Sequence, residues 1–146
     1  MGFPSASQTE FAFVRQLIEQ RRIPKDVTIQ VLTQARDELI ERTFESLKGV
    51  HRANVHFYNA TAPVWRKQVF HVDKAGCIAI AEAGARKVKT EAAKYPQTEW
   101  VFQYSPETFS TTEPDFGGDI GKAVNAVWQP EKGQQVIINL PSTVEM

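Results

Sequence analysis

The stretch EWVFQYSPETFSTTEPDF, residues 99–116, determines which fold class the sequence favours, because it holds a whole strand and the point at which that strand ends. Aromatic residues occupy every second position from 100 to 104, and this period of two is typical of a strand with one apolar face. The strand then leads into Ser105, Pro106 and Glu107. We therefore predict a strand whose carboxyl end presents a hydroxyl and a carboxylate, and we expect the proline to end the ladder so that the chain turns outward.

Helical and strand-like segments alternate on both sides of this stretch. The strands are predicted at residues 27–32, 53–59, 98–105 and 134–140. The main helices are predicted at residues 5–23, 35–49, 73–95 and 113–128, with a short helical segment at 64–70. This alternation implies parallel strands joined by right-handed crossovers. Glycines at positions 117, 118 and 121 are expected to leave the last helix frayed or altered, because each costs roughly 0.5–1 kcal/mol inside a helix.

Each predicted strand carries one apolar face and one largely polar face. In the second strand, for example, Val55 and Phe57 alternate with Asn54 and His56. Strands of a sheet covered by helices on both sides read instead as continuous apolar runs. The alternation therefore favours helices on one side and a polar interior on the other, as in a (β/α)8 barrel, whose catalytic face lies at the carboxyl ends of the strands. A whole barrel typically takes about 250 residues, so four strands predict an α/β fold that is a small open sheet or about half a barrel.

Composition excludes several classes of function. The chain of 146 residues has 17 basic and 17 acidic residues, so neither a nucleic acid nor an anionic membrane is an expected partner. No apolar run approaches the roughly 20 residues that span a bilayer, and the amino-terminal residues do not read as a signal peptide. A single cysteine, Cys77, excludes an internal disulfide framework. A cytoplasmic location is the expectation.

Five segments resemble the 2-isopropylmalate synthases, of the DRE-TIM metallolyase group, in the order in which that family has them. They are GFPSASQTEFAFVR (2–15), IQVLTQARDELIERTFESL (29–47), VHFYNATAPVWRKQVF (55–70), WVFQYSPETFSTTEPDF (100–116) and VIINLPSTVEM (136–146). The resemblance implies an acyltransferase that condenses acetyl-CoA with 2-oxoisovalerate to give 2-isopropylmalate in leucine biosynthesis. It also implies that the full-length enzyme uses a divalent metal (zinc, magnesium or manganese) to hold the oxo acid and polarise its carbonyl.

The same resemblance predicts which part of that enzyme the chain represents. Residues 1–146 correspond to a single partial catalytic barrel domain, a partial TIM (β/α)8 barrel with four parallel strands, the third to the sixth, and outer helices. The family's metal ligands are an Asp on the first strand and an H-x-H pair on the seventh, and these strands and the C-terminal regulatory domain are expected to be absent. We therefore expect the isolated chain to be inactive. Two unpaired sheet edges also predict a homo-oligomer.

By resemblance, Glu107 is the catalytic residue, while His56, Ser105 and Thr143 bind the substrate. From the residues alone, Glu107 could equally be a solvated loop carboxylate. A single strand histidine is more often structural, and a threonine after a strand is usually a turn residue. Ser105 could line the pocket or bond to the nearby backbone.

Two further polar residues, Gln34 and Arg36, follow the first predicted strand. They could orient the mouth of the barrel, or Arg36 could form a surface ion pair. Two alternatives to the synthase also stay open. One is a related Claisen-type enzyme, a homocitrate or citramalate synthase, which differs in the pocket for the oxo-acid side chain. The other is a non-catalytic binding or assembly module on the same scaffold.

Overall fold

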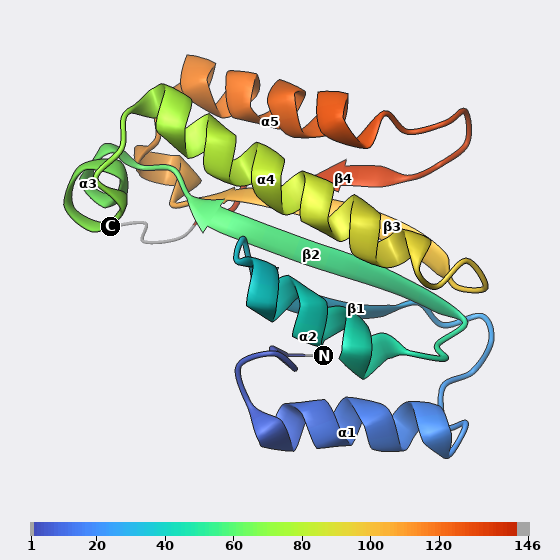
Figure 1. Ribbon diagram of the computed structural model, residues 1–146. Helices are drawn as coiled ribbons and strands as arrows, with labels where there is room; N and C mark the ends of the chain where they lie inside the picture. The colour runs from blue at the N-terminus through green and yellow to red at the C-terminus, as the bar shows by residue number, and fades with distance from the viewer. Residues whose placement is uncertain (1, 143–146) are drawn as a thin grey trace.

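The computed structural model describes residues 2–142, which form an α/β fold with one four-stranded sheet (Figure 1). The strands are β1 (Ile29–Gln34), β2 (Arg52–Ala60), β3 (Glu99–Glu107) and β4 (Val136–Ile138). They lie in the order β1-β2-β3-β4, and every neighbouring pair is parallel. This confirms the predicted arrangement of four parallel strands with flanking helices, as expected for part of a (β/α)8 barrel.

A helix precedes each strand, and the helices lie on one side of the sheet (Figure 1). The longer helices are α1 (Gln8–Glu19), α2 (Asp37–Leu47), α4 (Lys74–Ala93) and α5 (Pro114–Trp128). Three short elements occupy the connections: α3 (Pro63–Trp65), the π-helix η1 (Arg66–Phe70) and the 3-10 helix η2 (Phe109–Thr111). No helix within residues 2–142 is both long enough and apolar enough to cross a membrane.

Side chains at the helix starts explain where α1 and α4 begin. Ser7 Oγ accepts from the backbone N–H of Glu10 at 3.4 Å, and the Asp73 carboxylate accepts from that of Gly76 at 2.8 Å. Both are N-caps that satisfy a donor without a partner inside the helix. The Glu10 carboxylate accepts from the backbone N–H of Phe3, so it ties the preceding residues to α1.

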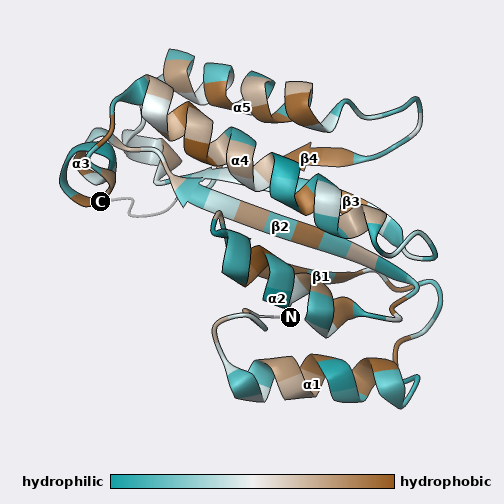
Figure 2. Cartoon of the chain, viewed as in Figure 1, coloured by the Kyte–Doolittle hydropathy of each residue, from teal (hydrophilic) through white to brown (hydrophobic). Residues whose placement is uncertain are grey.

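The core lies between the helices and the apolar face of the sheet. Figure 2 shows the alternation of hydropathy along β2, where Val55 and Phe57 are fully buried under the helices. The Phe57 ring lies 4.9 Å from the ring of Tyr104 and 5.7 Å from that of Trp128. Gly84 of α4 lets this helix approach Phe57 closely, because a Cβ there would lie 2.8 Å from Phe57 Cε2.

Two local expectations were wrong. α5 is continuous through its three glycines, because Phe116, Ile120 and Val124 form a buried stripe that packs on the sheet. β3 also continues through Pro106, which pairs in register with Asn59. The Glu107 carbonyl still accepts from the Thr61 N–H on the β2 side. The N–H that proline lacks lies on the opposite side, where β4 has already ended, so the ladder loses nothing.

Candidate active site

The polar face of the sheet carries side chains from all four strands and their carboxyl ends. Because barrel strands are tilted, several contacts across this face run diagonally, although Asn54 also bonds to Gln30, its partner in register. His56, for example, is in register with Gln103, yet its Nε2 lies 2.6 Å from Ser105 Oγ. Ser105 Oγ also accepts from Asn139 Nδ2 at 2.8 Å, which joins β2, β3 and the residues after β4.

Burial determines the charge state of His56. Its side chain is 9 % exposed, and this desolvation lowers the pKa of His56 to about 4. The imidazole is therefore neutral near pH 7, and it can donate one hydrogen bond and accept another.

Deeper in the same face, three carboxamides continue the hydrogen bonding away from His56. Gln30 Nε2 lies 3.4 Å from His56 Nδ1. Asn54 Nδ2 donates to Gln30 Oε1 at 3.1 Å and to Gln103 Oε1 at 2.7 Å. Asn54 Oδ1 is buried and accepts no hydrogen bond from residues 2–142. Gln30, itself held by Asn54, thus contacts the ring nitrogen of His56 that does not face Ser105.

His56, Ser105 and Glu107 line one cavity of about 150 Å³ at the carboxyl ends of the strands. The rest of its wall consists of Phe3, Leu32, Tyr58, Asn139 and Pro141. The lining thus combines hydrogen-bonding side chains with apolar ones. Such a cavity suits a small molecule that carries both hydrogen-bonding oxygens and a short apolar group.

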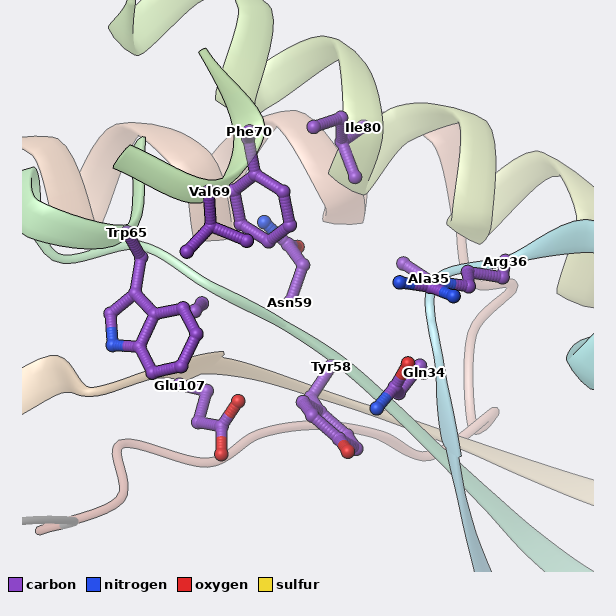
Figure 3. Close-up of a pocket in the computed structure, with 11 residues that line it drawn as sticks. Gln34, Ala35, Arg36, Tyr58, Asn59, Trp65, Val69, Phe70, Ile80 and Glu107 are labelled. Atoms are coloured by element: carbon purple, nitrogen blue, oxygen red, sulfur yellow. The ribbon is translucent and has the colours of Figure 1, made fainter. Parts of the chain in front are cut away.

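A second cavity, of about 290 Å³, lies beside the first (Figure 3). It is lined by Gln34, Ala35, Arg36, Tyr58, Asn59, Ala60, Trp65, Val69, Phe70, Ile80 and Glu107. Tyr58 and Glu107 belong to both cavities, so Glu107 can contact a molecule in either one. Burial raises the pKa of the Glu107 carboxyl, which therefore keeps its proton to a higher pH than an exposed glutamate. A carboxyl of this kind is suited to proton transfer.

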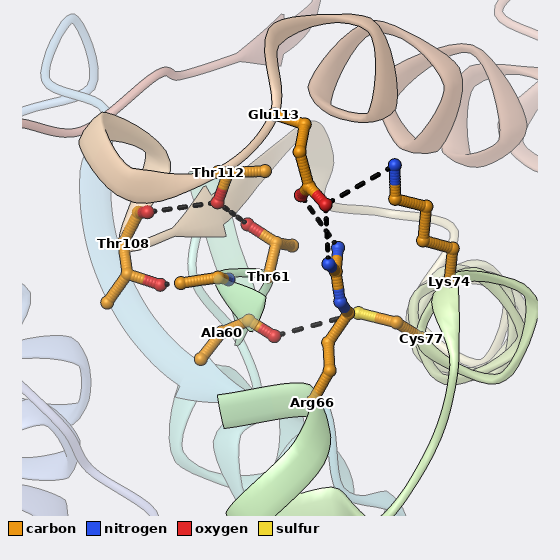
Figure 4. A network of polar contacts seen from close by, with 9 residues as sticks. Ala60, Thr61, Arg66, Lys74, Cys77, Thr108, Thr112 and Glu113 are labelled. Atoms are coloured by element: carbon orange, nitrogen blue, oxygen red, sulfur yellow. Dashed lines mark hydrogen bonds and ion pairs between the residues drawn. The ribbon is translucent and has the colours of Figure 1, made fainter. Parts of the chain in front are cut away.

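The connections above the cavities are tied together by an ion pair (Figure 4). The buried guanidinium of Arg66, in η1, binds the Glu113 carboxylate through two hydrogen bonds of 2.8 and 3.0 Å. Lys74 lies 3.3 Å from the same carboxylate. The hydrogen bonds from Arg66 lower the pKa of Glu113 to about 2. The pair fixes the segment after β2 to the segment after β3.

Threonines form a second tie between the same two connections, and Figure 4 shows it next to the ion pair. The hydroxyls of Thr61 and Thr112 are 2.7 Å apart, and Thr112 Oγ1 donates to the Thr108 carbonyl at 2.9 Å. Thr108 follows Glu107 directly and has a left-handed backbone, with φ of 59°. The carboxyl end of β3, and with it Glu107, is thereby held against the end of β2.

The structure brings three of the four residues of the sequence prediction into one cavity. Their functional roles stay predictions, and Thr143 lies outside the described residues. Gln34 and Arg36 line the second cavity. This position is compatible with the predicted place of both residues at the mouth of the barrel.

Sequence reasoning missed several residues of the site. Tyr58 could have been found from its place on the His56 face of β2, and Asn139 from the Asn-Leu-Pro segment after the last strand. The roles of Arg66 and Glu113 had no local signal, because they are 47 residues apart and meet only in the fold.

The described side chains offer no metal site. Residues 2–142 contain no group of three or more His, Cys, Asp or Glu side chains that could hold an ion. The donor set in this part of the chain therefore does not fit a divalent metal.

Comparison with known proteins gives a consistent result. The HMGL-like family matches the chain over residues 1–146. The chain is 64 % identical over 146 residues to a protein of Alcanivorax borkumensis named 2-isopropylmalate synthase. Proteins of the same name from Paraburkholderia phytofirmans and Azotobacter vinelandii are 60 % and 59 % identical, over 146 and 145 residues. These alignments cover 99–100 % of the chain but 26 % of each relative, so the chain spans about a quarter of their length.

Proposed function

Because the chain belongs to the HMGL-like family over residues 1–146, we propose that it forms part of the catalytic barrel of a 2-isopropylmalate synthase. The relatives that it matches at 57–64 % identity carry that name. In the proposed reaction the whole enzyme condenses acetyl-CoA with 2-oxoisovalerate, and water then hydrolyses the thioester to give 2-isopropylmalate and free CoA, a step of leucine biosynthesis in the cytoplasm. The observation that carries this proposal is the single cavity shared by His56, Ser105 and Glu107.

His56 and Ser105 are proposed to bind the oxygens of the oxo acid. Both are buried and neutral, and both line the cavity of about 150 Å³. Leu32 and Pro141 line the same cavity and offer apolar contacts, which suits the isopropyl group of 2-oxoisovalerate. Burial of this group, at roughly 0.8 kcal/mol per CH₂, favours a branched oxo acid over a shorter one.

Glu107 is proposed to handle a proton during the condensation. One C–H bond of the acetyl methyl group breaks and its proton passes to the Glu107 carboxylate, while that carbon forms the new bond to the ketone carbon, whose oxygen becomes an alkoxide. The Glu107 carboxyl, with its raised pKa, gives its proton to this oxygen. Since Glu107 also lines the second cavity, we propose that the acetyl thioester approaches from there, between Arg36 and Trp65.

The chain is assigned to the third to sixth strands of the barrel, as one partial catalytic domain. HMGL-like proteins generally use a divalent metal. Because no ligand group fits one within residues 2–142, we expect the isolated chain not to turn over substrate. Product formation by the purified chain with added zinc or magnesium would contradict this expectation.

Self-association is part of the same proposal. β1 and β4 lie at the two ends of the sheet, and each has an edge that pairs with no strand in the described part of the chain. Ile137, Ile138 and Leu140, in and after β4, are 37–55 % exposed. Such edges favour association through strand pairing. A homo-oligomer is therefore expected in sedimentation, and a monomer at high protein concentration would contradict it.

Chemical-shift mapping tests whether the cavity binds the oxo acid. 2-Oxoisovalerate is added at millimolar concentration to the ¹⁵N-labelled chain, and the largest shifts are expected at His56, Ser105 and Asn139. Glu107→Gln should change the affinity of the chain for 2-oxoisovalerate. Glu45→Gln, at an exposed position of α2, is the matched control and should leave this affinity unchanged. Stronger binding of 2-oxoglutarate or pyruvate would favour a homocitrate or citramalate synthase. Shifts confined to other surfaces would refute the assignment of the site.

A further inference from the structure

The hydrogen bonds across the polar face of the sheet run in one sense from donor to acceptor, and the first donor is the side-chain amide of Asn54. Its side-chain nitrogen donates to the oxygens of both Gln30 and Gln103, at 3.1 and 2.7 Å. A carboxamide whose oxygen is used on one side presents its NH₂ group on the other. The atom of Gln30 that faces His56 Nδ1 is therefore its Nε2, a donor, at 3.4 Å.

This direction decides which nitrogen of His56 carries the hydrogen. A neutral imidazole has one N–H and one acceptor nitrogen, and the hydrogen bond made by one nitrogen sets the state of the other. Nδ1 accepts from Gln30, so the hydrogen lies on Nε2. Nε2 in turn lies 2.6 Å from Ser105 Oγ, and in this tautomer it donates to the hydroxyl.

Ser105 then receives two hydrogen bonds. His56 Nε2 and Asn139 Nδ2, at 2.6 and 2.8 Å, fill both acceptor positions of the hydroxyl oxygen. The hydroxyl hydrogen has no acceptor among the contacts that Ser105 makes within residues 2–142, and Ser105 lines the cavity with Glu107. The Ser105 hydroxyl can therefore donate a hydrogen bond to a molecule in the cavity.

We propose that Gln30 is a positioning residue that fixes His56 as the Nε2–H tautomer, so that the Ser105 hydroxyl donates to an oxygen of the bound oxo acid. The identity of this ligand depends on the proposed function, but the tautomer does not. The charged or titratable groups that share the cavity with His56 are Tyr58 on β2 and Glu107 on β3. Gln30, on β1, contributes no charge.

The tautomer can be measured directly on the chain at pH 7. Long-range ¹H–¹⁵N correlation distinguishes protonated from unprotonated ring nitrogens, and His56→Gln assigns the signals against those of the exposed His51 and His71. We expect Nε2 of His56 to be protonated and Nδ1 to be unprotonated. Protonation of Nδ1 in the unmodified chain, alone or together with Nε2, would overturn the proposal without any variant.

Gln30→Glu is the decisive variant. A carboxylate only accepts hydrogen bonds, so it should move the hydrogen of His56 to Nδ1, and Ser105 should then donate to Nε2 instead of to the ligand. Losing one hydrogen bond should weaken the binding of 2-oxoisovalerate roughly two- to tenfold. Gln16→Glu, at an exposed position of α1, makes the same chemical change away from the site and should alter neither quantity.

The two proposals fail in different ways. An unmodified chain with the Nε2–H tautomer that does not bind 2-oxoisovalerate would refute the ligand and leave the assignment of the tautomer supported. A Gln30→Glu chain that keeps the Nε2–H tautomer, or binds the oxo acid as well as the unmodified chain does, would refute the positioning role.

Discussion

Replacing Gly84 by alanine should destabilise the chain, because α4 crosses Phe57 at this glycine. A Cβ at position 84 would lie 2.8 Å from Phe57 Cε2 and 3.1 Å from Ala35 Cβ. The Phe57 ring is fully buried between Tyr104 and Trp128, so it has no free space into which to move. Overpacking of this kind costs about 1–3 kcal/mol.

Gly118→Ala is the matched control, because it makes the same substitution inside α5 at a site with no atom within 4 Å of the added Cβ. Alanine gains about 0.5–1 kcal/mol over glycine in a helix interior, and both variants gain it. Gly118→Ala should therefore be more stable than the unmodified chain, and Gly84→Ala should be about 1–3 kcal/mol less stable than Gly118→Ala.

Urea unfolding followed by circular dichroism measures both free energies of unfolding, with the slope against urea as a check that the unfolding reaction is unchanged. In thermal unfolding, each 1 kcal/mol corresponds to a shift in Tm of about 2–4 °C for a chain of this size. If the Gly84→Ala chain were as stable as the Gly118→Ala chain, the packing of α4 on Phe57 described above would be wrong.

Three further predictions concern pH and reactivity. The folded chain holds the pKa of His56 at about 4, below the unfolded value of about 6.5, so stability should fall as the pH falls between these values, and His56→Gln should remove that slope from urea titrations. The pKa of Glu113 is about 2 instead of 4.5, so the stability contributed by its pair with Arg66 is complete above pH 4.5 and lost towards pH 2; an unchanged acid slope in Glu113→Gln would contradict this. Cys77 is fully buried and burial raises its pKa, so a thiol reagent should label it slowly until urea unfolds the chain, and rapid labelling without urea would show that it is accessible.

The layers of the fold, with helices on one face of the sheet and polar side chains on the other, could be predicted from the sequence. Alternation of apolar and polar residues along β2 assigned Val55 and Phe57 to the helix side and His56 to the other, and the structure places them so. This succeeds because successive side chains of a strand point to opposite faces, which is a local property. The alternation of helices with strands predicted parallel pairing for a different reason, because a helix that connects two strands returns the chain to the same end of the sheet.

Features that depend on the relation between distant segments could not be predicted in this way. The diagonal contact of His56 with Ser105 depends on the tilt of the strands, which no local pattern records. Pro106 illustrates the same limit. It was expected to end β3, and whether a proline ends a ladder depends on which side its missing N–H faces.

Glu107 and Tyr58 belong to both cavities, and this common wall has a thermodynamic consequence. If an occupant of one cavity shifts either side chain, it changes the affinity of the other cavity by some factor. Linkage requires the second occupant to change the affinity for the first by that same factor. The Glu107 and Tyr58 side chains thus determine whether one bound molecule strengthens or weakens the binding of the other. A binding isotherm measured for one cavity therefore depends on whether the other cavity is occupied.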